Sequence, residues 1–115
     1  MSDWPRPVVH WALSARDPQA QRAFYMALFN WDIEEGGLMN IGAGLGSPEP
    51  GPAGHIQQGE PGVSLYVQVR DIRAALIKLV ELGGTVTMEP MDVPGGPTIA
   101  FFKDPEGNPM GLVQQ

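Results

Sequence analysis

The chain has 115 residues and no cysteine, so we expect one domain without disulfides, thiolate nucleophiles or cysteine-ligated metals. Thirteen acidic residues against seven Lys and Arg give a formal net charge of −6, which argues against a nucleic-acid partner because phosphate binding needs clustered cations. No apolar run approaches a membrane span, and the first residues lack the apolar stretch of a signal peptide, so we expect a cytoplasmic protein without a membrane partner.

The first predicted strand covers residues 8–14, where apolar and mixed positions alternate. Its apolar face, with Trp11, should pack under a helix, whereas its mixed face, with His10, should line a cavity. Residues 63–69 repeat this alternation 54 positions later. The helix-facing set of this second strand is Val63, Leu65, Val67 and Val69, and its cavity-facing set is Ser64, Tyr66 and Gln68.

Each of these strands leads to an aspartate that can cap a helix by accepting from free backbone N–H groups. Asp17 is followed by Pro18, which suits the first helical position, and helical periodicity then extends to Phe29. Asp71 precedes a similar stretch over residues 72–82, which Gly83 and Gly84 should end. The sequence therefore predicts two helices at equivalent places in two related halves.

Short strands should follow each helix: residues 31–35, 38–41 and 54–58 in the first half, and 85–88, 98–103 and 110–114 in the second. The resulting unit is β-α-β-β-β, written twice. The fold class is therefore α+β, with two tandem modules over residues 7–58 and 62–115 in a single domain. Each module should be a curled mixed sheet with one helix, and together they should form a cleft.

Residues 42–62, between the two modules, are rich in Gly and Pro. Such composition is typical of a linker with hairpin loops, because Gly and Pro supply the backbone angles of turns. A mobile flap over a pocket is the alternative. With Trp4 and Trp11, this loop is a candidate for dimer contacts, because exposed sheet edges favour a homodimer.

The chain resembles the glyoxalase / bleomycin-resistance / extradiol-dioxygenase superfamily, which has the vicinal oxygen chelate fold. The matching segments span nearly the whole chain: residues 8–11, Asp17, residues 24–31, 66–69, 83–84 and 101–108. The resemblance implies paired modules around a cleft, in a homodimer. It implies no single reaction, because the family includes isomerases, lyases, dioxygenases and non-catalytic drug-binding proteins.

Metal-using members of this family place ligands on the first and last strand of each module. His10 matches the first position, and its counterpart in the second module is Ser64. The last-strand positions fall on Gly111 and, by aligning residues 54–58 with 111–115, on Gly54. Glycine has no ligand atom, so we predict no metal and no other cofactor unless His55 or a loop carboxylate completes the site. The same alignment predicts that His55 points away from the cavity.

The chemistry then depends on His10, which suits a general base or a hydrogen-bonding partner of a ligand. A His10 without catalytic duty is the alternative, because no orienting carboxylate is evident. Tyr66 could add a hydrogen bond or a ring, and one of Phe101 and Phe102 must face the cleft, since strand residues alternate. The predicted ligand-binding set is His10, Ser64, Tyr66, Gln68, Phe101 and Phe102, and no catalytic residue is assigned.

We predict metal-independent binding of a small organic molecule in an apolar cleft, as in the drug-binding members of the family. With a charge of −6, a neutral or cationic aromatic ligand is favoured over a dianion. The alternative is a lyase, isomerase or related enzyme acting on a small carbonyl metabolite, with His10 as base or metal ligand.

Overall fold

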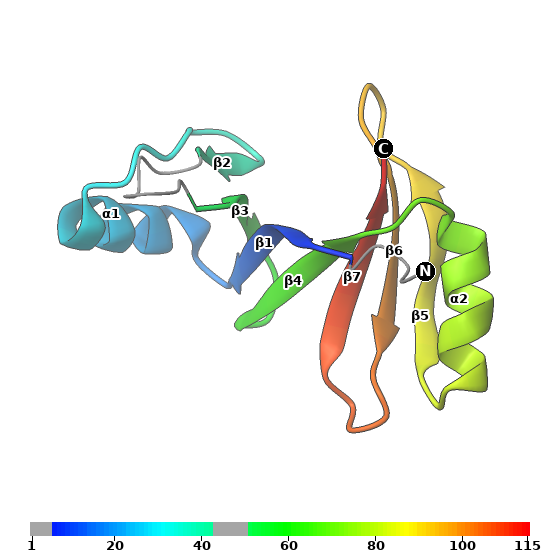
Figure 1. Cartoon of the computed structure of the whole chain (residues 1–115). Helices are drawn as coiled ribbons and strands as arrows, with labels where there is room; N and C mark the ends of the chain where they lie inside the picture. Colours follow the sequence, from blue (N-terminus) through cyan, green and yellow to red (C-terminus); the bar gives the residue numbers. More distant parts are fainter. Residues whose placement is uncertain (1–5, 43–50) are drawn as a thin grey trace. The chain divides into compact units, whose positions relative to one another are not determined.

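The computed structural model describes residues 6–42 and 51–115, so Trp4 and positions 43–50 of the Gly- and Pro-rich loop lie outside it. Contacts divide the chain into two compact units. We call His10–Ser64 the first unit, and Leu65–Gln115 together with Met1–Val9 the second unit. The described residues form two helices and seven strands (Figure 1), which confirms the predicted α+β fold class.

The first unit contains β1 (Val8–Ala15, from His10 onward), α1 (Pro18–Phe29), β2 (Met39–Ile41) and β3 (Ala53–Gln58). In its sheet, β3 lies between β1, to which it is parallel, and β2, to which it is antiparallel. The predicted cap of α1 is confirmed, since the Asp17 carboxylate accepts from the Ala20 N–H at 3.1 Å. Asn30, with φ of 59°, ends the helix in the left-handed conformation.

The predicted strand over residues 31–35 is wrong. Only one bridge forms there, between Ile33 and Ile41, and one further backbone bond joins the Glu34 N–H to the Asn40 carbonyl at 3.0 Å. The partner strand β2 has three residues, so it is too short for a longer ladder. Ile33 nevertheless enters the core of the first unit, where it is 1% exposed.

The core of the first unit lies between its sheet and α1. Its buried members are Ala15, Ile33, Met39, Ile41 and Ile56, with Trp11, Leu13, Tyr25, Met26 and Trp31 packed around them. The helix-facing position predicted for Trp11 is thus confirmed. Trp11 also lies directly over Gly54, its cross-strand partner, and its indole N–H donates to the Pro52 carbonyl at 3.1 Å.

The second unit contains most of β4 (Gly62–Gln68), then α2 (Ile72–Glu81), β5 (Thr85–Asp92), β6 (Thr98–Lys103) and β7 (Pro109–Gln114). β4 runs parallel to β7, and β7, β6 and β5 are joined antiparallel in that order. Figure 1 shows α2 along one face of these strands. The core beneath it consists of Val69, Ile72, Leu76, Ala100 and Leu112, bordered by Val67, Ala75, Leu79, Val86 and Phe102.

The predicted cap of α2 is also confirmed, because the Asp71 carboxylate accepts from the Ala74 N–H at 3.0 Å. Val67 and Val69 pack against α2 as expected, but Val63 and Leu65 are 58% and 40% exposed. The helix packs on Val67, in the later part of β4, and on Val69 just after that strand. In the described part of the chain, neither helix has the length and apolar character needed to cross a membrane.

Substituting Gly54 by alanine should destabilise the protein by about 1–3 kcal/mol, because a methyl group there would overlap the Trp11 indole. Gly62→Ala is the matched control, since nothing lies within 4 Å of a Cβ at that position. Urea unfolding of both variants measures the difference. Equal free energies of unfolding for Gly54→Ala and Gly62→Ala would show that the Trp11 ring does not pack against Gly54.

Candidate functional site

The parallel register of β1 and β3 brings the two histidines of the chain together. His10 lies opposite Ala53 and Ala12 lies opposite His55, so both imidazoles project from the face of the sheet that is turned away from α1. His10 Nε2 is 2.7 Å from His55 Nδ1, and the rings stack with centroids 5.0 Å apart.

The expectation that His55 points away from His10 is therefore wrong. The alignment of residues 54–58 with 111–115 placed Gly54 on the face of His10, but Gly54 lies under Trp11 on the helix side. A shift of one residue along a strand moves every side chain to the opposite face, which exchanges Gly54 for His55. The sheet face that carries His10 thus holds two imidazoles instead of one.

The pair continues into a chain of hydrogen bonds. His55 Nε2 lies 2.9 Å from Gln57 Oε1, and Gln57 Nε2 donates to Ser14 Oγ at 3.0 Å. His10 and Ser14 come from β1, whereas His55 and Gln57 come from β3, with Ser14 directly opposite Gln57. Sequence reasoning missed Gln57 and Ser14 and placed His55 on the wrong face; the alternate spacing of these residues along two strands was the signal that could have found them.

Burial favours the neutral form of His10. His55 is 8% exposed, and desolvation, followed by the closeness of the His55 imidazole, lowers the pKa of His10. A neutral imidazole carries one N–H donor and one acceptor nitrogen, so each ring can pass a hydrogen bond along the chain. His10 therefore has the orienting partner that the sequence did not reveal.

His10 also lines a hollow of about 340 Å³ within the first unit. The polar side chains around it are those of Asp32, Glu34 and Asn40, and the Glu34 carboxylate accepts from the Asn40 amide at 2.9 Å. Backbone and small side chains at Gly42, Ala53 and Gly54 complete the described lining. The hollow is small and rich in hydrogen-bond acceptors, and His10 is its one imidazole.

In the second unit, Tyr66 and Phe101 flank Gly111 on the face opposite α2. Both are cross-strand partners of Gly111, and their rings meet edge to face with centroids 5.7 Å apart. Burial raises the pKa of Tyr66, which keeps its phenol neutral. Phe102 lies on the other face, in the core under α2, so Phe101 is the one that shares a face with Tyr66.

The remaining predicted residues lie on β4. Gln68 is opposite Val113 on β7, and its backbone N–H donates to the Pro7 carbonyl at 2.9 Å. Ser64 is partly buried and belongs to the unit that contains His10, whereas Tyr66, Gln68 and Phe101 belong to the other unit.

The donor set does not fit a divalent metal ion of the kind that the fold family uses. The described residues bring together no group of three His, Asp or Glu side chains that could hold one. At the last-strand position of the second module, the ring of Tyr66 fills the space, since a Cβ on Gly111 would lie 2.8 Å from Tyr66 Cδ2. His10 and His55 are hydrogen-bonded to each other, and two imidazoles supply too few ligand atoms for such a site.

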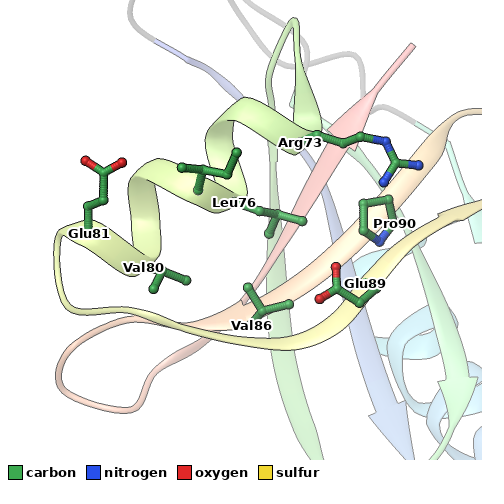
Figure 2. A pocket seen from close by; sticks show the side chains of 8 residues that line it. Arg73, Leu76, Val80, Glu81, Val86, Glu89 and Pro90 are labelled. Atoms are coloured by element: carbon green, nitrogen blue, oxygen red, sulfur yellow. The ribbon is translucent and has the colours of Figure 1, made fainter.

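A second hollow lies between α2 and β5, with a volume of about 480 Å³ (Figure 2). Its floor is apolar, with Leu76, Val80 and Val86, and charged side chains such as Arg73 and Glu89 stand at its border. It contains no imidazole and none of the residues predicted for ligand binding. The hollow beside His10 is therefore the better candidate for chemistry.

Because the pKa of His10 is lowered on folding, the unfolded chain binds this proton more readily than the folded one. The resulting stabilisation is present above the unfolded pKa of about 6.5 and is lost as the pH falls below it. We expect the free energy of unfolding to decrease from pH 7.5 to 5, and to decrease less in His10→Gln. Urea unfolding at several pH values measures both slopes, and a native protein that gains stability over this range would contradict the assignment.

Comparison with known proteins places these features in a family. A family model described as a glyoxalase-like domain matches residues 10–113. The curated proteins named "Putative glyoxylase CFP32" from Mycobacterium bovis and Mycobacterium tuberculosis are each 28% identical over 124 residues, with 98% of this chain and 48% of the relative covered. The chain thus spans about half the length of these curated relatives.

Solved structures share the fold at lower identity. A glyoxalase/bleomycin resistance protein/dioxygenase superfamily member from Vibrio splendidus aligns with a TM-score of 0.68 and 13% identity, covering 96% of this chain and 100% of that one. A variant of Streptomyces coelicolor methylmalonyl-CoA epimerase, in complex with 2-nitronate-propionyl-CoA, aligns with a TM-score of 0.64 and 21% identity, covering 94% and 96%. Since the family model covers nearly the whole chain, the protein belongs to the glyoxalase-like domain family.

Proposed function

We propose that this glyoxalase-like protein binds a small organic molecule without a metal ion and that neutral His10 is its main polar contact. The observation that carries the proposal is the hydrogen bond of 2.7 Å between His10 and His55, extended through Gln57 to Ser14. These hydrogen bonds hold the His10 imidazole beside a hollow of about 340 Å³ that is bordered by polar groups. A concave site with a few convergent polar groups is the usual form of a small-molecule site.

Tyr66 and Phe101 of the second unit stay predicted aromatic ligand contacts, and Gln68 and Ser64 stay predicted polar contacts. The edge-to-face rings over Gly111 present an aromatic surface, which suits a planar or cationic group. The net charge of −6 opposes the approach of a polyanion, so a neutral or cationic aromatic compound is the proposed ligand class.

A second candidate is an enzyme that removes a proton from a small carbonyl compound, with His10 as general base. The specific observation in its favour is that His10 has a buried, hydrogen-bonded partner, which a base needs in order to be held in place. Methylmalonyl-CoA epimerases are among the structural neighbours, although their identity of about 20% supports only the shared fold. Deuterium uptake from D₂O by a bound carbonyl compound, absent in His10→Gln, would separate catalysis from simple binding.

A thermal-shift screen of neutral and cationic aromatic compounds tests the binding proposal. A ligand present at 100 times its Kd should stabilise the protein by about 2.7 kcal/mol. We expect this shift to disappear in His10→Gln and to persist after treatment with a chelator. Stabilisation that needs an added divalent ion would contradict the metal-free proposal.

Arg73→Gln is the matched control, because Arg73 borders the hollow between α2 and β5 and lies outside the His10 hollow. It should leave the ligand-induced shift unchanged. If Arg73→Gln removes the shift and His10→Gln does not, the ligand binds beside α2 and the assignment of the site is wrong.

We also propose a homodimer in the cytoplasm. Large apolar side chains on both helices are exposed, among them Phe24 at 55%, Leu28 at 57% and Ile77 at 64%, and such surface favours association. Light scattering at micromolar protein should therefore give the mass of two chains. A measured mass of 12.4 kDa, that of one chain, would refute the dimer.

A further inference from the structure

The four polar side chains on the outer face of β1 and β3 form one continuous chain of hydrogen bonds. It runs from His10 through His55 and Gln57 to Ser14, with separations of 2.7, 2.9 and 3.0 Å. Its two inner members have no place in the predicted ligand-binding set, and His55 is 8% exposed. His55 is buried and does not line the hollow, so it can act on a ligand there through His10, which does line it.

The direction of the chain follows from its atoms. Gln57 presents its carbonyl oxygen to His55, and a carbonyl oxygen only accepts, so His55 Nε2 carries a proton. In a neutral imidazole the other nitrogen then accepts, which makes His10 Nε2 the donor to His55 Nδ1. His10 Nδ1 is consequently the acceptor nitrogen of the outer ring.

We infer that His55 and Gln57 are positioning residues that fix this tautomer of His10, and that the ligand is accordingly a hydrogen-bond donor such as a phenol, an enol or an amine. The inference rests on the proposed function, because it defines the ligand class of the same site. The carboxylates of Asp32 and Glu34, which line the same hollow, favour a donor as well. A ligand that offers only hydrogen-bond acceptors would face the acceptor nitrogen of His10 and the two carboxylates, and it could form no hydrogen bond with them.

The tautomer can be measured without any ligand. The chain contains two histidines, so long-range ¹H–¹⁵N spectra of the intact protein contain two imidazole patterns. We expect His10 to carry its proton on Nε2. His55→Leu should abolish this preference. His55→Asn, which can place an amide oxygen near the former Nδ1, and Gln57→Glu, whose carboxylate only accepts, should preserve it.

Phenol and anisole are the binding probes, because they share a ring and differ in one O–H donor. Phenol should bind the native protein about tenfold more tightly than anisole, the effect of one hydrogen bond of about 1.4 kcal/mol. The ratio should be retained in His55→Asn and Gln57→Glu and should fall towards one in His55→Leu. Thermal unfolding of each variant shows that it is folded, and NMR titration gives the affinities.

Three results would overturn the inference: a native His10 protonated on Nδ1, equal affinity for phenol and anisole, or a His55→Leu protein that keeps both the tautomer and the ratio. Failure of the proposed function is a different result, in which His10→Gln leaves ligand-induced stabilisation intact. The tautomer measurement does not depend on that outcome, so the two failures can be told apart.

Discussion

The register between the parallel strands β1 and β3 is the constraint on which the candidate site depends. With His10 opposite Ala53, the same pairing sends Trp11 onto Gly54 on the helix side and brings His10 to His55 on the other side. Any other register would separate the histidines or drive the indole against a side chain. Close packing of Trp11 on a residue without a Cβ therefore fixes the geometry of the polar chain on the opposite face.

The two modules place glycine beneath an aromatic ring in different ways. In the first unit Gly54 accommodates Trp11 on the side of α1, whereas in the second unit Gly111 accommodates Tyr66 on the side away from α2. The second arrangement places an aromatic ring where metal-using relatives of the fold would need a ligand side chain. The residues that the structure describes at these positions offer imidazoles and aromatic rings rather than a cluster of metal ligands.

The likeness to known proteins and the local geometry support different parts of the interpretation. Membership of the glyoxalase-like family establishes a fold that serves many reactions, so it does not select one. The buried partner of His10 is particular to the residues present here, and it supplies what a lone histidine would lack: a defined orientation and a neutral ring. The proposed ligand class follows from these residues rather than from the family.

The sequence by itself determined the elements with strong local signals. The aspartate caps of α1 and α2 and the alternation in β1 depend on neighbours within a few residues, and each lies where it was predicted. Only the tertiary structure decided that His55 joins His10, that Gly54 belongs to the helix side and that residues 31–35 make a single bridge. These features depend on the register between strands distant in the sequence, where a shift of one residue exchanges the two faces and leaves the local pattern unchanged.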